Sequence, residues 1–164
     1  IKLNGAPTDA VLYRRRLYTL HSQDNQIYKY EPTRTGFAAG TPWVTDGTDV
    51  KDARSLTVDG SAYLLTQDTV NELRRGARVD FTLKGIDPPL AAPAKIWTLD
   101  TSDYLYILET AGKRLIVVAK KDGALKAQYV SPTFSDLRDF TIDEQKKTAY
   151  LLDGQAVVSI PLSH

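Results

Sequence analysis

The chain has 164 residues, a formal net charge of +1 and no cysteine. This length suits one domain with its own core, and the lack of cysteine excludes disulfides and Cys-based zinc sites. The nearly balanced charge gives no overall field that would attract nucleic acid. No methionine is present, not even an initiator, so we expect the chain to be processed or cut from a longer one.

The chain begins with the phrase IKLNG at residues 1–5, and a first unit follows at residues 6–46. This unit contains four runs rich in Val, Ile, Tyr, Leu and Thr: AVLYR, LYTLH, NQIYKY and PWVTDG. Turn-forming Gly, Asp, Asn or Pro bound the runs, which favours short β-strands. We therefore predict four strands in this unit.

The second and third units repeat this order with better-preserved runs. Residues 47–85 contain SLTVD, AYLLT, TVNELR and RVDFTLKG, and residues 86–131 contain IWTLD, LYILE, KRLIVV and LKAQYVSP. The tyrosines of the second runs recur at intervals of 45, 43 and 44 residues, as Tyr18, Tyr63, Tyr106 and Tyr150. Four strands with a period near 44 residues are typical of a β-propeller blade.

The fourth unit, residues 132–164, contains DFTID, AYLLD and QAVVSI but lacks a last strand. Residues 1–5 match the ends of earlier units, FTLKG and WVTDG. We predict an all-β fold, a single propeller domain of four four-stranded antiparallel blades in which the N-terminal strand completes the last blade. This pairing would cover an open sheet edge. The alternatives are a four-blade segment of a larger propeller and a ring closed by two chains.

The third unit, LYILETAGKRLIVVAKKDGALKAQYVSP, resembles the blades of NHL-type and YWTD-like propellers, and the likeness covers all four units. The resemblance implies a ligand-binding or partner-binding ring. Such rings are often the sensory or adhesive part of a bacterial multidomain protein, sometimes the extracytoplasmic part of a kinase or phosphatase. Some relatives are calcium-dependent lactonases or lyases, but no residue set in this chain matches their metal ligands.

The loops that join the blades are expected to build one face of the disc, here called the upper face. The second runs end at this face in four different residues: His21, Thr66, Glu109 and Asp153. Such variation fits a binding surface, and it equally fits turns whose sequences have drifted. The loops add the charged residues Asp9, Asp49, Lys51, Asp52, Arg54, Asp87, Lys95, Asp136 and Arg138. Because rigid scaffolds often carry function on loops, we predict that a protein, peptide or glycan binds here.

Three first runs share a central threonine, Thr57, Thr98 or Thr141. Their apolar neighbours alternate with them and should pack between blades, so the threonines are predicted to line the central channel. The alternative is a packing role, because threonine is a good strand former.

The opposite, lower face is expected to collect basic hairpin turns that contain Arg14, Arg15, Arg16, Arg74, Arg75, Arg78, Lys120, Lys121, Lys146 and Lys147. Such a face would suit an acidic partner or an acidic membrane surface. The turns lack interleaved aromatic residues, so we expect no nucleic-acid partner.

Catalytic signatures are missing from the sequence. The chain has two histidines, one of them the final residue, which leaves too few for a histidine metal cage or a Ser-His-Asp triad. The DGTD and DTSD phrases are too short for a calcium loop. We expect a non-catalytic binding module without a cofactor. The alternatives are a purely structural assembly module and a calcium-dependent lactonase or lyase that uses the upper carboxylates Asp9, Asp52, Glu109, Asp136 and Asp153.

Overall fold

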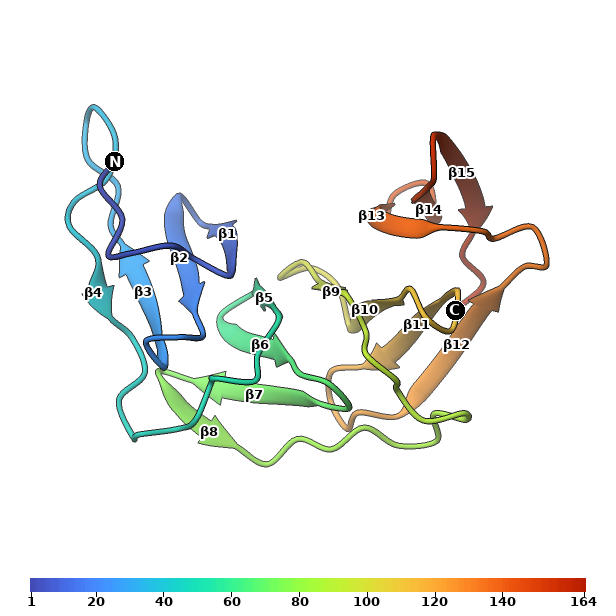
Figure 1. The fold of residues 1–164 in the computed structure, drawn as a ribbon, viewed down its shortest axis with the longest axis horizontal. Helices are drawn as coiled ribbons and strands as arrows, with labels where there is room; N and C mark the ends of the chain where they lie inside the picture. Colours follow the sequence, from blue (N-terminus) through green and yellow to red (C-terminus); the bar gives the residue numbers. More distant parts are fainter.

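The computed structural model describes all residues from 1 to 164. It contains fifteen β-strands in four antiparallel sheets and no helix (Figure 1). There is accordingly no helix long and apolar enough to cross a membrane.

Each sheet forms from consecutive strands, and we call the sheets blades 1 to 4. Blade 1 contains β1 (Asp9–Tyr13), β2 (Arg16–His21), β3 (Gln26–Tyr30) and β4 (Thr41–Pro42). Blade 2 contains β5 (Ser55–Val58), β6 (Ser61–Leu65), β7 (Val70–Arg74) and β8 (Ala77–Val79). Blade 3 contains β9 (Lys95–Trp97), β10 (Tyr104–Glu109), β11 (Arg114–Ala119) and β12 (Leu125–Val130). Blade 4 contains β13 (Leu137–Asp143), β14 (Thr148–Asp153) and β15 (Ala156–Pro161).

The blades stand side by side in an arc, with the first strand of each blade nearest the centre (Figure 1). Strand β1 packs against β5, β5 against β9, and β10 against β13. Blades 1 and 4 lie at the two ends of the arc and share no hydrogen-bonded strands. The predicted all-β propeller fold with four blades is confirmed.

The hydrophobic core consists of three separate cores, one between each pair of neighbouring blades. Successive side chains of a strand point to opposite faces of its sheet, so each inner blade contributes one row to the core on either side. In blade 2, Leu64 packs toward blade 1 and Leu65 toward blade 3. In blade 3, Ile107 packs toward blade 2 and Leu108 toward blade 4.

The predicted closure of the ring is wrong, because blade 4 has three strands and residues 1–5 form no strand. The backbone amide of Asn4 instead donates a hydrogen bond to the Tyr30 hydroxyl at 3.3 Å, and the Asn4 side chain donates to the Gly40 carbonyl at 3.3 Å. The N-terminal segment therefore lies on blade 1, far along the chain from the blade it was expected to complete.

The sequence likeness behind this prediction has a different structural meaning. Residues 43–47 and 81–85 are straps that leave one blade and bond to the next. Thr45 donates its amide proton to the Gly76 carbonyl at 2.9 Å, and Lys84 donates to the Gly123 carbonyl at 2.9 Å. At Gly76 a Cβ atom would lie 2.0 Å from the Trp43 oxygen, so only glycine leaves room for the strap. Residues 1–5 occupy the same kind of position on blade 1.

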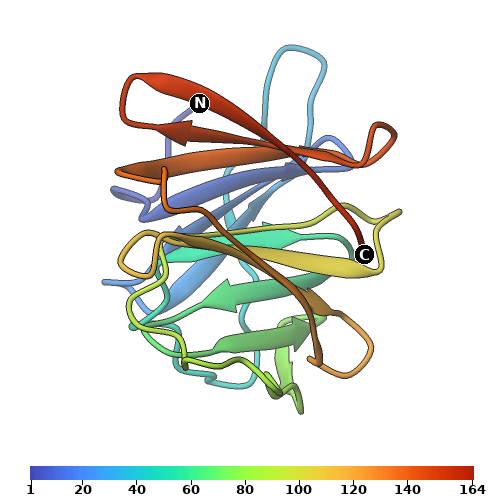
Figure 2. The ribbon, with the colours of Figure 1, turned by 90° about the vertical axis from the view of Figure 1, so that its right-hand side faces the viewer.

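The C-terminal residues return from blade 4 to blade 3 (Figure 2). Leu162 is buried in the core between these blades, and the Ser163 amide donates to the Tyr129 hydroxyl at 2.8 Å. The His164 ring lies 3.1 Å from both the Tyr106 and the Tyr129 hydroxyl oxygens. The chain end thus holds the outermost blade to its only neighbour.

Candidate functional site

The four residues at or directly after the ends of the second strands are buried in the upper face. His21, Thr66, Glu109 and Asp153 are 2%, 8%, 1% and 8% exposed. Glu109 forms an ion pair with Arg114 and accepts a hydrogen bond from the Ala91 amide. These two contacts tie the end of β10 to β11 and to the loop that enters blade 3.

Asp153 has a comparable role in blade 4. Its carboxylate accepts the backbone amides of Ser135 at 3.1 Å and Asp136 at 2.5 Å, and it also accepts the Ser135 hydroxyl. These donors, the Asp136 amide first, lower the pKa of Asp153 below its ordinary value. The charged form of the Asp153 side chain therefore holds the loop between blades 3 and 4.

The remaining two positions are also engaged within the chain. Thr66 accepts the Thr69 amide at 3.2 Å, and His21 Nε2 lies 2.8 Å from the Thr19 hydroxyl. Burial lowers the pKa of His21, and its Nδ1 has no hydrogen-bond partner. All four positions thus have structural contacts, and their predicted contact with a ligand stays a prediction.

The repeated threonines lie between blades and not in an open channel. Thr57 and Thr98 are buried, the Thr57 hydroxyl accepts the Thr98 amide at 3.2 Å, and the Thr98 hydroxyl donates to the Tyr104 carbonyl at 2.6 Å. Only Thr141 is exposed, on the end of the arc. Side chains of a blade point toward its neighbours, so the channel-lining prediction is corrected to the packing role for Thr57 and Thr98.

The starts of the four first strands converge at the upper end of the central axis. They line a cavity of about 290 Å³, here called the channel mouth, with Thr8, Asp9, Arg54, Ser55, Ala94, Lys95, Arg138 and Asp139. Four of the predicted binding residues therefore meet here, one from each blade: Asp9, Arg54, Lys95 and Arg138. The sequence placed them in equivalent loops, and the arc brings these loops together.

The charges of the channel mouth are held by local partners. Asp9 accepts the Ser55 hydroxyl and the Leu56 amide, both at 2.8 Å, and so links blades 1 and 2. Lys95 forms an ion pair with Asp139 that links blades 3 and 4.

The arginines of the mouth pair with residues of their own blades. Arg138 Nε donates to Asp136 at 2.8 Å, and this carboxylate raises the pKa of Arg138. Arg54 donates to the Gln67 side chain. Both guanidinium groups belong to exposed residues, so they can reach a bound molecule.

A second hollow of about 380 Å³ lies on the upper face beside blade 2. Asp52 and Thr66 line it together with Asp68, Asn71 and Arg78. The predicted place of Arg78 on the lower face is therefore wrong, because its guanidinium reaches along the blade to the Asn71 side chain at 2.7 Å. Lys51 is exposed and lies outside both upper hollows. The predicted binding residues are thus divided between the channel mouth, this hollow and the buried loop contacts.

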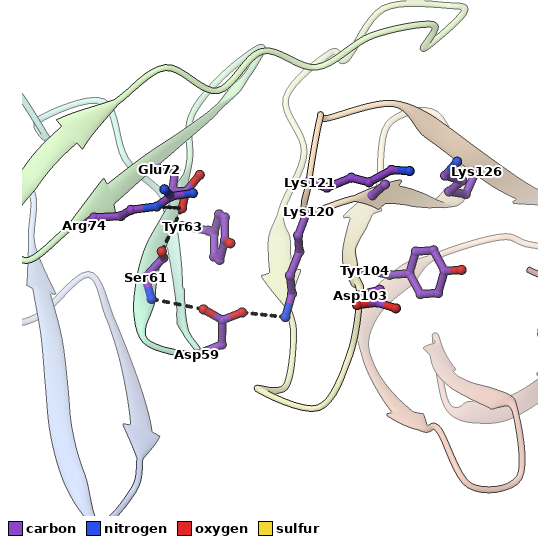
Figure 3. A pocket seen from close by; sticks show the side chains of 11 residues that line it. Asp59, Ser61, Tyr63, Glu72, Arg74, Asp103, Tyr104, Lys120, Lys121 and Lys126 are labelled. Atoms are coloured by element: carbon purple, nitrogen blue, oxygen red, sulfur yellow. Dashed lines mark hydrogen bonds and ion pairs between the residues drawn. The ribbon is translucent and has the colours of Figure 1, made fainter.

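A cavity of about 660 Å³ opens on the lower face between blades 2 and 3 and is here called the lower pocket (Figure 3). Its lining residues are Asp59, Ser61, Tyr63, Glu72, Arg74, Asp103, Tyr104, Ala119, Lys120, Lys121 and Lys126. The sequence placed Arg74, Lys120 and Lys121 on this face but gave no sign of a pocket. The wall combines residues of two blades, and no single repeat contains that combination.

Two ion-pair clusters hold the walls of the lower pocket. Lys120 pairs across the seam with Asp59 and donates to the Leu99 carbonyl at 2.6 Å. Glu72 accepts Arg74 at 2.8 Å and the Ser61 hydroxyl at 2.7 Å. Burial raises the pKa of Tyr63, which lies between the clusters.

The donor set does not fit the calcium ion that the enzyme alternative requires. No group of three or more His, Asp or Glu side chains is placed to hold a metal ion. Of the upper carboxylates, Asp9, Glu109 and Asp153 are each committed to hydrogen bonds within the chain.

No family model and no curated protein matches the chain by sequence. Several solved structures are similar to it in fold. Virginiamycin B lyase from Staphylococcus aureus shares 14% identity over 99% of this chain and 58% of its own, with a TM-score of 0.61. A streptogramin B lyase shares 14% identity over 94% of this chain and 54% of its own, with a TM-score of 0.61. Kluyveromyces lactis Hsv2 shares 10% identity over 100% of this chain and 50% of its own, with a TM-score of 0.63.

These neighbours are β-propeller proteins, and at such identities the similarity establishes the fold alone. The chain spans 50% to 58% of the lengths of the three proteins. Its likeness to NHL-type and YWTD-like blades stays a resemblance. By fold, the chain is a four-blade β-propeller.

Proposed function

We propose that this chain is a non-catalytic binding module that holds a protein, peptide or glycan on its upper face, around the channel mouth. The observation that carries this proposal is the convergence of Asp9, Arg54, Lys95 and Arg138 from four blades on one cavity. The NHL-like resemblance adds that the module is the sensory or scaffold part of a longer bacterial protein.

The chemistry of the mouth favours a ligand with carboxylate or hydroxyl groups. Exposed ion pairs contribute little stability, about 0–1 kcal/mol, so a ligand can replace the partners of Arg138 and Lys95 at small cost. A guanidinium also binds a carboxylate through two parallel hydrogen bonds. Asp9 stays bound to blade 2 and keeps the wall of the mouth in place.

An array of printed peptides and glycans tests this proposal directly. The wild-type chain should bind a defined subset, and the double variant Arg54→Ser, Arg138→Ser should bind the same spots at least about tenfold more weakly, since each tenfold corresponds to 1.4 kcal/mol. The matched control is Lys146→Ser, Lys147→Ser in the β13–β14 turn of the lower face, outside both cavities, which should leave the subset unchanged. An array without specific spots, or loss of binding in the control alone, would contradict the proposal.

The enzyme alternative requires a calcium site and is tested separately. A ligand that binds only the folded chain raises its unfolding temperature. We expect the same unfolding temperature with calcium and with chelator, and a rise of several degrees with calcium would favour the lactonase or lyase function. A purely structural assembly module would bind nothing on the array.

A further inference from the structure

We propose that the lower pocket is a second ligand site, separate from the channel mouth, and that it takes a small anionic saccharide such as a sugar acid or a sugar phosphate. Its volume of about 660 Å³ falls within the range of small-molecule sites, roughly 300–1,000 Å³. The proposal does not depend on the function of the upper face.

The positive charge of the pocket is only partly neutralised by its own residues. Asp59 pairs with Lys120 and Glu72 with Arg74, whereas Lys121 and Lys126 form no ion pair and no side-chain hydrogen bond. Both line the pocket, and in Figure 3 the Lys121 side chain extends toward the side on which Lys126 lies. Two neighbouring ammonium groups repel each other unless an anion lies between them. This pair therefore favours a ligand with an oxyanion group.

The same end of the pocket also contains a group that suits hydroxyls. The Asp103 carboxylate has no hydrogen-bond partner in the chain, whereas the Tyr104 ring is turned toward His164 and the core between blades 3 and 4. An ionised carboxylate only accepts hydrogen bonds, so Asp103 would repel a bare anion but would bind the hydroxyls of a sugar. A ligand that has both hydroxyls and one oxyanion satisfies Asp103, Lys121 and Lys126 together.

The pocket walls are held in place before a ligand arrives. The Lys120–Asp59 pair joins the two blades across the pocket, and Tyr63, 4% exposed, forms part of its floor. Preorganised walls lower the entropic cost of binding. The three free groups stand on this rigid base at the start of β10 and on both sides of the β11–β12 turn.

Titration calorimetry at low ionic strength tests the proposal with four probes: glucuronate, glucose 6-phosphate, glucose and inorganic phosphate. We expect glucuronate and glucose 6-phosphate to bind at least about fivefold more tightly than glucose and inorganic phosphate, because each contacts the lysines and Asp103. Equal binding of inorganic phosphate would reduce the pocket to a plain anion site and overturn the saccharide assignment. No heat with any probe would overturn the site itself.

Three variants locate the binding. Lys121→Ser, Lys126→Ser should weaken glucuronate binding at least about tenfold, and Asp103→Asn should weaken glucuronate binding without weakening inorganic phosphate. The control, Lys146→Ser, Lys147→Ser, removes two lysines from the β13–β14 turn outside the pocket and should change nothing. An equal loss in this control would mean general charge attraction and would contradict the proposal.

Discussion

The phrase AYLL occurs twice in the chain, in blade 2 as residues 62–65 and in blade 4 as residues 149–152, with different environments. In blade 2 all four side chains are buried, because blades lie on both sides. In blade 4 Leu151 is buried against blade 3, whereas Leu152 is 37% exposed. The burial of these identical residues thus depends on the position of their blade in the arc.

The same difference in burial appears in the residue pairs that join the second and third strands. Leu20, Leu65 and Leu108 stand opposite Ile27, Val70 and Leu115, and all six are 0% exposed. In blade 4 the equivalent pair is Leu152 and Val157, and Val157 is 69% exposed. In blades 1 to 3 the next blade along the chain covers this apolar row. In blade 4 the same row is exposed.

The largest expected effect contrasts the two equivalent leucines. Leu65→Ala should lower the free energy of unfolding by about 2–5 kcal/mol, because it leaves a cavity in a packed core. Leu152→Ala should cost less than about 1 kcal/mol, because the removed atoms are already partly in water. Urea unfolding of both variants measures the difference, and equal costs would show that blade 4 is covered in solution.

A smaller effect concerns the pH dependence of the loop before blade 4. The backbone and hydroxyl donors of residues 135 and 136 lower the pKa of Asp153, so its stabilisation is present above the ordinary pKa of about 3.9 and is lost as the pH falls through the lowered value. Asp153→Asn removes this charge.

We therefore expect the urea midpoint of the wild-type chain to fall more steeply between pH 6 and pH 3 than that of Asp153→Asn. Asp52→Asn, which removes a carboxylate from an exposed residue, is the matched control. Parallel pH profiles for the wild type and Asp153→Asn would contradict the structural role of Asp153.

Removal of residues 1–5 should have a modest effect. The segment contributes two hydrogen bonds from Asn4 to blade 1, and each is worth about 0.5–1.5 kcal/mol. We expect the free energy of unfolding to fall by about 1 kcal/mol. Amide exchange should become faster in β3 and stay unchanged in β15. Faster exchange in β15 instead would restore the original prediction of ring closure.

The smallest expected effect is that of a charge on the uncovered row. Val157→Asp should change the free energy of unfolding by less than about 0.5 kcal/mol, as at other exposed positions. Val158→Asp is the matched control, because Val158 packs against the core between blades 3 and 4 and its replacement by a charge should be clearly destabilising. Similar losses from both would mean that Val157 is also covered.

The sequence was sufficient for the fold because the 44-residue period repeats tyrosines, turn residues and apolar alternation together. It was insufficient for the closure, since the match between IKLNG and FTLKG identifies a strap but not the blade on which it rests. The channel mouth was partly predictable, because Asp9, Arg54, Lys95 and Arg138 occupy similar loop positions. The lower pocket was not, because Lys126 and Tyr63 lie on separate blades and only packing places them on one wall.

The division of the core into three shared parts has a consequence for unfolding. A chain of this kind behaves as a one-dimensional array in which each unit is stabilised by its nearest neighbours. Blades 2 and 3 each take part in two cores, whereas blades 1 and 4 take part in one. Opening should therefore begin by fraying at the ends of the arc and reach β6, β10 and β11 last. The seam that contains the lower pocket thus lies in the part of the molecule that opens least often.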